Sequence, residues 1–539
     1  EFIVILNFIF ICSFNLMNFE YSIDSLFDAG NIEVLYTNQF IHYITFPIIG
    51  GFMFGYVTGT VPDVYGIFHM FMVATIAGGA LLSSLPTGYL ADRFGRKKTI
   101  ILSCLFYIVG SLISFNYRVV IAVGRFLIGI GLGISSTCCP LYIAEITPKV
   151  IRGRIITIYQ ICLTFGLFLA SVVNATLNYA SPTYGSDTTT PIILITPAVP
   201  ALFLLIGMLT VPESYRWLLS KNRIDEAIEV VRKLKQIPES NITEFVENIL
   251  EANVLIEEDL QEQKEQKKFI LCRILGDKIA RKTLVMGCSL QMLAQLIGIN
   301  GLMYYANSLF QKYVTNNIKI YLWFTPLLTF INLISSFVAY KLIDKIGRRK
   351  LALISLFGII SSSVIIAVNL QLVDVRYLKR NQNNNCRNFL SCDDCINNIC
   401  EYCQIDENSG YTCVNYGANC TNKGNYPIYN FDNHCTNNIN WILLLGMILY
   451  VISFAIGMGP IPWVVTSEIY PAWCRSTNMA LSTTAKWLCN LTVTMTVFTR
   501  RLYETFWIYS AFTICGIALI YKNFPEMNQA NMEEILHVL

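Results

Sequence analysis

The sequence predicts an all-α integral membrane protein, with twelve transmembrane helices in two six-helix halves and a small disulfide-rich extracellular insertion. The first observation behind this is composition: 54% of the residues are hydrophobic and only 14% are charged, whereas soluble domains have about 25% charged residues. The second is that apolar stretches of about 20 residues, the length that crosses a bilayer core, recur along the chain. The third is that two charged motifs occur twice in the same order, which indicates an internal repeat.

The apolar stretches give the positions of the expected helices, six in each half. Each has the length and the low charge that a membrane span requires. The expected spans are residues 41–61, 67–90, 99–116, 119–143, 154–178, 191–211, 284–309, 319–342, 350–371, 441–465, 476–499 and 503–522.

The repeated motifs lie at the ends of these helices. Asp92-Arg-Phe-Gly-Arg96 is matched by Asp344-Lys-Ile-Gly-Arg348, and the E-x-x-P-x-x-x-R motif that begins at Glu145 returns at Glu468. A charge at the end of a membrane helix is costly unless it is paired or reaches the headgroups. We expect these pairs either to hold an inner gate shut or only to anchor the loops. The charged residues expected to pair are Asp92, Arg96, Glu145, Arg152, Glu213 and Arg216 in the first half and Asp344, Arg348, Glu468 and Arg475 in the second.

The basic residues indicate the orientation. Lysine and arginine gather in the short loops after the even-numbered helices, and such loops stay in the cytoplasm. Both termini are therefore expected inside and the insertion outside. The expected divisions are an unassigned lead-in at 1–40, the first half at 41–211, a cytoplasmic helical linker at 212–283, helices 7–9 at 284–371, the cysteine-rich insertion at 372–440, helices 10–12 at 441–524 and a cytoplasmic tail at 525–539.

The insertion contains eight cysteines. An even number of cysteines on the oxidising side of a membrane predicts up to four disulfides, with a connectivity that the sequence leaves open. The spacing C-x2-C-x4-C-x2-C within the set is also compatible with zinc, which the oxidising compartment disfavours. The cysteines are Cys386, Cys392, Cys395, Cys400, Cys403, Cys413, Cys420 and Cys435.

Further motifs are GRF at 124–126, PESYRWL at 212–218, QLIGIN at 295–300, GPIPW at 459–463 and FPE at 524–526. Together they resemble the sugar porter family of the major facilitator superfamily, over nearly the whole chain from Gly50 onward. The cysteine insertion is similar to the plexin-like extracellular loop of the myo-inositol transporter branch of that family. The resemblance implies the major facilitator fold, and a plasma-membrane carrier of hexose or myo-inositol that works by alternating access.

The resemblance also implies a substrate site midway through the membrane, between the two halves. Side-chain amides and indoles suit a polyol because they bond hydroxyls without a buried charge. An amide in a membrane helix also commonly bonds a neighbouring helix, and that alternative applies to each residue. The expected substrate residues are Gln160, Gln291, Gln295, Asn300, Asn332, Trp463, Lys486, Trp487 and Asn490, and Tyr304 and Tyr305 resemble the outer aromatic gate of the family.

Three positions depart from the family pattern. Ala294 replaces one of two paired glutamines. Val57 replaces the aspartate of proton-coupled members, although its partner Arg125 is present. This predicts uniport, with a proton-coupled symporter as the alternative. Lys486 stands where the family has Asn or Gln. Its ammonium either faces the cavity, which favours an acidic or unusually hydroxylated substrate, or pairs with a neighbouring carboxylate or carbonyl.

Other classes of function have little support. A net charge of +3 indicates no nucleic-acid partner. Four histidines and no clustered nucleophile indicate that the protein is not an enzyme, and we expect no cofactor and no metal. The expected partners are the substrate and the lipid bilayer. A non-transporting sugar sensor, whose cysteine module meets an extracellular partner, is the alternative from another class.

Overall fold

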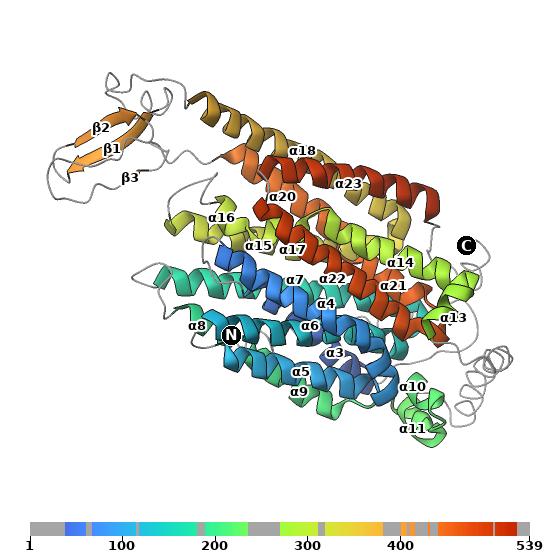
Figure 1. Ribbon diagram of the computed structural model, residues 1–539. Coiled ribbons are helices and arrows are strands. Elements are labelled where there is room, and N and C mark those ends of the chain that lie inside the picture. Colours follow the sequence, from blue (N-terminus) through green and yellow to red (C-terminus); the bar gives the residue numbers. More distant parts are fainter. Residues whose placement is uncertain are drawn as a thin grey trace.

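The described part of the chain is a bundle of long helices with one small sheet beyond one end (Figure 1). In this computed structural model, the described residues are 38–60, 67–114, 118–180, 189–234, 270–310, 318–380, 400–406, 410–415, 430–431, 440–499 and 502–524.

Helices occupy all six stretches expected in the first half. The sixth is made of two consecutive helices, α8 and α9, and the others are continuous. Their bounds are α3 Asn38–Gly59, α4 Ile67–Phe94, α5 Arg96–Ile113, α6 Arg118–Ile146, α7 Lys149–Ala180, α8 Thr189–Ile195 and α9 Ala198–Thr210.

The second half repeats this arrangement with two interrupted helices. The first is broken after α14 and the fourth after α20, and both breaks fall within the predicted spans. The bounds are α14 Lys278–Leu296, α15 Ile299–Tyr304, α16 Ala306–Leu309, α17 Ile318–Ile346, α18 Arg348–Arg380, α20 Trp441–Ile456, α21 Ile461–Ile469, the 3-10 helix η3 Ala472–Cys474, α22 Arg475–Thr499 and α23 Leu502–Asn523.

The repeated glycine explains the sharp turns at one end of each half. Gly95 separates α4 from α5 with a φ of 99°, and Gly347 separates α17 from α18 with a φ of 93°. Residues with a Cβ rarely adopt this backbone conformation, so the motif requires glycine there. The turn keeps Asp92 next to Arg96, and Asp344 next to Arg348.

The two halves meet along two seams. One joins α4 to α22, and the other joins α7 to α17. The seams are related by the repeat, because α4 and α17 are the second helices of their halves and α7 and α22 are the fifth. These four helices therefore flank the region between the halves.

Ten helical stretches are long and apolar enough to cross a membrane, among the residues that the structure describes. Of the twelve expected spans, those at α5 and α22 are not among the ten. Helix α5 begins with three basic residues, and α22 is rich in Ser, Thr and Asn. Helix α22 packs against α4, α14, α6 and α15, so protein rather than lipid surrounds much of its polar surface.

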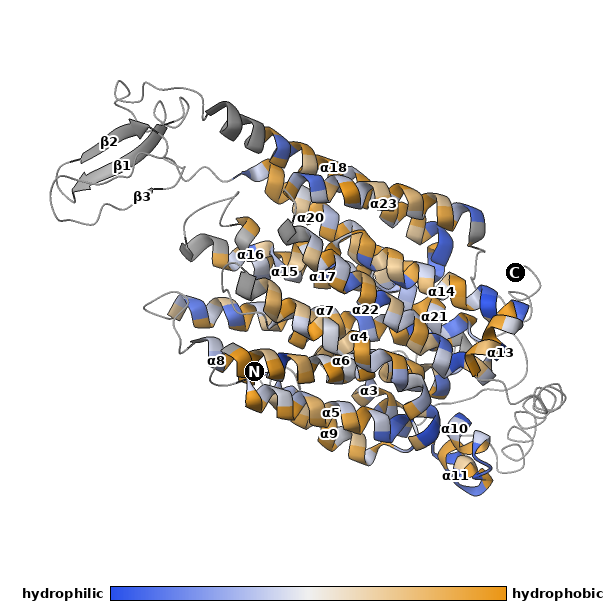
Figure 2. Ribbon diagram, in the orientation of Figure 1, coloured by the Kyte–Doolittle hydropathy of each residue, from blue (hydrophilic) through white to orange (hydrophobic). Residues whose placement is uncertain are grey.

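Hydrophilic residues gather at one end of the bundle, beside α10 (Tyr215–Ser220), α11 (Ile224–Leu234) and α13 (Ile270–Gly276) (Figure 2). We call this the basic end, because Arg93, Lys98, Lys345 and Arg349 lie there. Helix α11 has its acidic residues in the first turn and its basic residues in the last, which suits the helix dipole. Residues 235–269 of the expected cytoplasmic linker lie outside the described residues.

The insertion contains a three-stranded antiparallel sheet in the order β2-β1-β3, at the end of the bundle opposite α10 and α11 (Figure 1). The strands are β1 Cys400–Asp406, β2 Gly410–Asn415 and β3 Asn430–Phe431. Only the backbone of Cys400, Cys403 and Cys413 is described. The other expected disulfide cysteines lie outside the described residues: Cys386, Cys392, Cys395, Cys420 and Cys435.

Candidate functional site

A buried cluster of charges joins three elements at the basic end of the first half. Arg96 donates from Nη2 (2.8 Å) and Nε (3.1 Å) to Oε1 of Glu145, and its Nη2 lies 3.2 Å from a carboxylate oxygen of Asp92. Its Nη1 donates to the carbonyl of Ala91 at 3.0 Å. Arg96 and Glu145 are both buried. We call Asp92, Arg96 and Glu145 the first-half cluster.

The second half contains the equivalent cluster. Nη2 of Arg348 lies 3.2 Å from Glu468 and 3.6 Å from Asp344. The motif glycine explains the close approach of the aspartate to the arginine in both halves. We call Asp344, Arg348 and Glu468 the second-half cluster.

Each cluster is tied to the opposite half through its aspartate. Arg154 on α7 forms an ion pair with Asp344, and the Ser476 hydroxyl on α22 donates to Asp92 at 2.6 Å. Arg154 was absent from the expected gating set. The position equivalent to Arg154 in the second copy of the repeat is Thr477. Because Arg154 has no basic counterpart there, a comparison of the two copies does not identify it. Both ties close the basic end between the halves.

The second arginine of each repeated motif does not pair as expected. Arg152 donates to the carbonyl of Thr147, and Arg475 to that of Tyr470, each at 3.3 Å. Within the described residues neither forms an ion pair with Glu145 or Glu468, since Arg96 and Arg348 occupy those carboxylates. The carbonyls precede the motif prolines at helix C-termini, where a cation is favourable. These arginines therefore hold the turn of each motif.

Glu213 caps helix α5 and forms no ion pair within the described part of the chain. Its carboxylate accepts from the backbone N–H groups of Arg96 (2.9 Å), Lys97 (3.1 Å) and Ser214 (3.0 Å). Burial raises the pKa of Glu213, and these three donors act in the opposite direction. Arg216 lies against the ring of Tyr215. The expected pairing of Glu213 with Arg216 is replaced by a helix cap, because the unpaired N–H groups at a helix start attract a carboxylate.

The cap leads to a prediction for Gly95→Ala. A Cβ at this position would lie 2.2 Å from Oε2 of Glu213, and the φ of 99° is unfavourable for alanine. We expect the free energy of unfolding to fall by about 1–3 kcal/mol, as measured by denaturation of the detergent-solubilised protein. Gly78→Ala is the matched control, because a Cβ there meets nothing within 4 Å. Equal stability of the two variants would contradict the cap.

Several of the expected substrate amides bond to one another. Oε1 of Gln295 accepts from Asn300 and, at 3.1 Å, from Asn490 on α22. Gln291 donates to the carbonyl of Pro462 at 3.4 Å. The break between α14 and α15 brings these groups together, because Gly298 has a φ of 91°. In this conformation these four side chains bond to other groups of the protein, which is the alternative to substrate binding that the sequence left open.

Other buried acceptors lack a partner among the described residues. They are Oε1 of Gln160, Oδ1 of Asn332 and Oδ1 of Asn490. A buried acceptor without a hydrogen bond costs about 1–3 kcal/mol. These three oxygens could accept from hydroxyl groups of a polyol, and they come from α7, α17 and α22, which form the seams between the halves.

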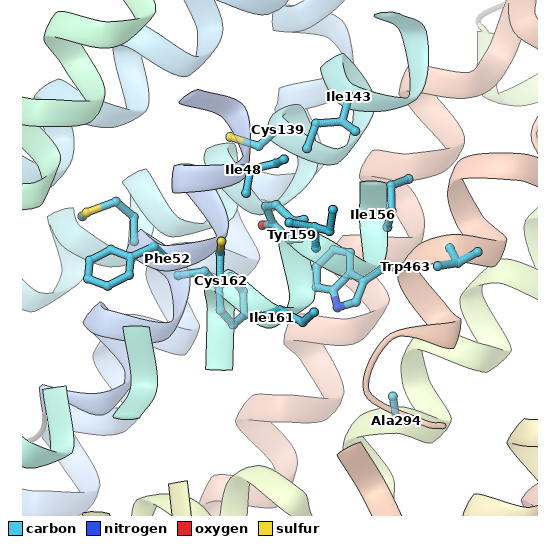
Figure 3. Packing of buried hydrophobic residues seen from close by; sticks show 14 of the residues in the cluster. Ile48, Phe52, Cys139, Ile143, Ile156, Tyr159, Ile161, Cys162, Ala294 and Trp463 are labelled. Carbon is cyan, nitrogen blue, oxygen red and sulfur yellow. The ribbon is translucent and has the colours of Figure 1, made fainter. Parts of the chain in front are cut away.

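Trp463 lies between the halves. Its ring is 5.9 Å from that of Tyr159 on α7 and 6.2 Å from that of Phe54 on α3 (Figure 3 shows Tyr159 beside Trp463). The neighbouring Trp487 donates from Nε1 to Ser136 on α6 at 3.3 Å. Aromatic side chains of the second half thus contact three helices of the first.

Three aromatic rings surround the ammonium of Lys486. Its Nζ is 3.9 Å from the ring centre of Trp463, 4.4 Å from that of Phe54 and 5.3 Å from that of Trp487. We call these rings the aromatic cage. A lysine at the centre of a membrane helix costs about 2.5–3.5 kcal/mol, and desolvated cation–π contacts return about 2 kcal/mol. Of the two alternatives that the sequence leaves open, a pairing of Lys486 with a carboxylate is not seen within the described residues, and the ammonium lies between the halves.

Arg125 is fully buried in α6, and none of its three guanidinium nitrogens has a hydrogen-bond partner among the described residues. Val57, where the family resemblance places an aspartate, is also fully buried. The structure therefore retains the arginine of the proton-coupled pair without its carboxylate.

A small polar pocket lies nearer to the end of the bundle opposite the basic end. Its volume is only about 40 Å³, far below the roughly 300–1,000 Å³ of most ligand pockets. Tyr304 lines it, while Tyr305 is buried and donates to the carbonyl of Thr494 at 3.4 Å. The polar lining residues are Thr58, Ser171, Asn174, Asn307, Thr325 and Thr329.

Comparison with known proteins gives consistent matches. A family model described as "Sugar (and other) transporter" matches residues 63–385 and 422–539. The chain is 32% identical to the "Proton myo-inositol cotransporter" of Homo sapiens, over 93% of this chain and 82% of that protein. It is 28% identical to the "Probable inositol transporter 2" of Arabidopsis thaliana, over 91% of this chain and 90% of that one.

Among solved structures, the chain resembles the proton:xylose symporter XylE bound to 6-bromo-6-deoxy-D-glucose. The TM-score is 0.70 at 22% identity, over 93% of this chain and 98% of that one. A partially occluded inward-open form of XylE from E. coli gives 0.64 at 22% identity, over 91% and 100%. At this identity the likeness establishes the fold.

Proposed function

Because the chain belongs to the sugar (and other) transporter family, we propose that it carries a monosaccharide or cyclic polyol by alternating access. It is a multi-pass integral membrane transporter of the major facilitator fold and not an enzyme. One observation supports the mechanism above the others: unpaired buried acceptors, Trp463 and Lys486 lie between two halves that are tied together at one end. Such a site can be exposed to either side only if the halves rock.

The proposal includes a topology. Helices α5 and α22 complete twelve crossings, with the basic end in the cytoplasm and the cysteine insertion outside the cell, in the plasma membrane. The basic loops favour this orientation. The name of the human relative, a myo-inositol cotransporter, supports myo-inositol as the substrate, and a hexose is the alternative that the family resemblance implies.

The insertion is proposed to be the plexin-like module expected from the sequence, with its eight cysteines in disulfides. Mass spectrometry of the intact protein under non-reducing conditions tests this, after thiols have been labelled. We expect no label on residues 386–435. Eight labelled thiols there would contradict both the disulfides and the extracellular location.

The transport proposal is tested in liposomes that contain only the purified chain. A panel of labelled monosaccharides and cyclic polyols is offered from outside to vesicles preloaded with the unlabelled compound. If the exchange rate of at least one compound is roughly ten times the rate in protein-free liposomes, the result supports a carrier. Binding without exchange for every compound would support a sensor instead.

We propose that the carrier is a uniporter. Proton coupling needs a group that gains and loses a proton during the cycle, and Val57 cannot titrate. The second candidate is a proton symporter, which is favoured by the name of the human relative. Uptake at equal substrate concentrations inside and outside separates them: accumulation driven by an inward proton gradient would establish symport, and its absence supports uniport.

The tie between Arg154 and Asp344 leads to a further prediction. Both side chains are about one quarter exposed, so water limits the strength of the pair. We expect Arg154→Glu to repel Asp344, to open the basic end and to lower exchange roughly tenfold, whereas Arg154→Lys keeps most of it. The distance between site-specific labels at Lys98 and Lys345 should increase in Arg154→Glu. An unchanged distance together with unchanged exchange would exclude a gating role for this pair.

A further inference from the structure

Helix α13 and the first two turns of α14, residues 270–285, form an exposed corner at the basic end, where Figure 2 shows hydrophobic and hydrophilic residues beside one another at α13. We call it the α13–α14 corner. Leu275 is 56% exposed, Ile279 42% and Ile270 39%. All three lie at or just before the start of a candidate membrane span, Lys278–Tyr304. Apolar side chains exposed at that level of the chain can contact the acyl chains of a bilayer.

Exposed cations share the corner with these apolar side chains. Lys278, Arg281 and Lys282 are all exposed. Lys278 and Lys282 are four residues apart on α14 and therefore lie on the same face, which continues with the exposed Val285. The guanidinium of Arg281 donates to the carbonyl of Leu275 at 3.0 Å, which holds it against α13. The face is basic at the start of the span and apolar beyond it.

The carboxylate within the corner does not neutralise these cations. Residues 270–285 contain four cations and one acidic residue, Asp277. Asp277 accepts from the backbone N–H groups of Ile279 at 2.7 Å and Ala280 at 3.2 Å and so caps α14. Lys278, Arg281 and Lys282 form no ion pair within the described part of the chain. The corner thus presents a net positive charge to its surroundings.

Arg273 adds a cation that the fold holds in place. Its guanidinium carbon lies 4.8 Å from the ring centre of Trp473 in η3. Its Nε and Nη2 have no hydrogen-bond partner among the described residues. Ile274 and Ala280 pack with Cys474 in a small apolar cluster, so the corner is docked on the second half. A planar guanidinium with free donors suits a phosphate group.

The internal repeat does not require a basic corner. Helix α3 is the counterpart of α14, since each is the first helix of its half. The span of α3 contains no lysine or arginine. If basic residues at this position only anchored a span, the same need would exist in both halves. The cations of the corner therefore serve something that is specific to the second half.

We propose that the α13–α14 corner binds the headgroup of an anionic phospholipid. Clusters of four or more lysines and arginines beside a membrane span attract anionic headgroups. The exposed apolar side chains contact the acyl chains of the same lipid. A soluble phosphate would leave Leu275 and Ile279 in water, so charge and apolar exposure together fit a lipid. The inference concerns a partner of the protein and is independent of which substrate it carries.

The test measures lipid retention by the purified full chain. The protein is reconstituted in vesicles of equal parts phosphatidylcholine and phosphatidylglycerol, extracted in mild detergent and examined by native mass spectrometry. We expect the retained lipid to contain about ten times more phosphatidylglycerol than phosphatidylcholine. Phosphatidylglycerol should also raise the unfolding temperature of the extracted protein, because a ligand of the folded state stabilises it.

Variants locate the retained lipid. The triple variant Lys278→Gln, Arg281→Gln and Lys282→Gln should lower the ratio of phosphatidylglycerol to phosphatidylcholine about fivefold or more and abolish the thermal effect. The matched control removes three exposed cations elsewhere at the basic end and should change the ratio less than about twofold. It carries Lys98→Gln, Lys345→Gln and Lys350→Gln.

Two further variants separate charge from fold and lipid from free phosphate. Lys278→Arg, Arg281→Lys and Lys282→Arg together keep the charge and should keep the preference for phosphatidylglycerol. Leu275→Ser with Ile279→Ser should weaken retention of the lipid, because the acyl contact is lost. Monodisperse elution checks that each variant is folded.

Each other outcome would contradict the proposal. Equal retention of the two lipids by the natural chain would mean that the corner does not select charge. A preference lost in the control variant and kept in the glutamine triple variant would place the site elsewhere. Displacement of the lipid by millimolar glycerol phosphate, with no effect of the serine variant, would identify a soluble phosphate as the ligand. None of these results depends on transport, so the proposed function is tested separately.

Discussion

Replacing Arg96 with alanine is expected to lower the free energy of unfolding by about 3–5 kcal/mol, because it leaves Glu145 buried without its partner. Arg96 binds Glu145 and Asp92 and also the carbonyl of Ala91, so the ends of α4, α5 and α6 all lose a contact. The measurement is chemical or thermal unfolding in detergent. Exchange in liposomes should fall roughly a hundredfold if the first-half cluster closes the basic end.

The controls separate charge from position. Arg93→Ala removes an exposed arginine three residues away, and we expect it to change stability by less than about 0.5 kcal/mol. Arg96→Ala combined with Glu145→Gln should recover part of the lost stability, since no unpaired charge then remains buried. If Arg96→Ala and Arg93→Ala were equally stable, the buried pair would have no structural role.

Introducing aspartate at Val57 is expected to convert the uniporter into a proton-coupled carrier. The carboxylate would enter a fully buried position in the half that holds Arg125, whose guanidinium has no hydrogen-bond partner among the described residues. The family resemblance pairs these two groups. With one proton per substrate, an inward gradient of one pH unit corresponds to about 1.4 kcal/mol. We therefore expect about tenfold accumulation of substrate in the variant and none in the natural chain.

Val57→Asn is the control, because it has nearly the same shape as aspartate and cannot titrate. It should show exchange without accumulation. Accumulation in the natural chain under the same gradient would refute uniport and direct attention to Lys486. Equal behaviour of Val57→Asp and Val57→Asn would mean that the position does not reach Arg125.

The structure has a helix at every span that the sequence predicts. A long apolar stretch in a bilayer must satisfy its backbone hydrogen bonds internally, and a helix does so. The repeat identified Arg96, Glu145, Arg348 and Glu468, whose equivalent pairs form in both halves. These contacts follow from local rules: the motif glycine turns the chain, and four residues separate each aspartate from its arginine. The broken helix near Gly298 also lies within a motif that was recognised from the sequence.

Only the tertiary structure decided which of the remaining charges meet. Arg154 pairs with Asp344 across 190 residues, and Asp92 with Ser476 across 384, so no spacing rule connects them. Glu213 was expected in an ion pair but caps α5, because the fold brings the unpaired N–H groups of Arg96 and Lys97 to its carboxylate. Lys486 was left with two alternatives by the sequence, and rings from three separate helices enclose it. Burial among neighbours distant in sequence decides such contacts, since the free energy of a buried charge depends on what surrounds it.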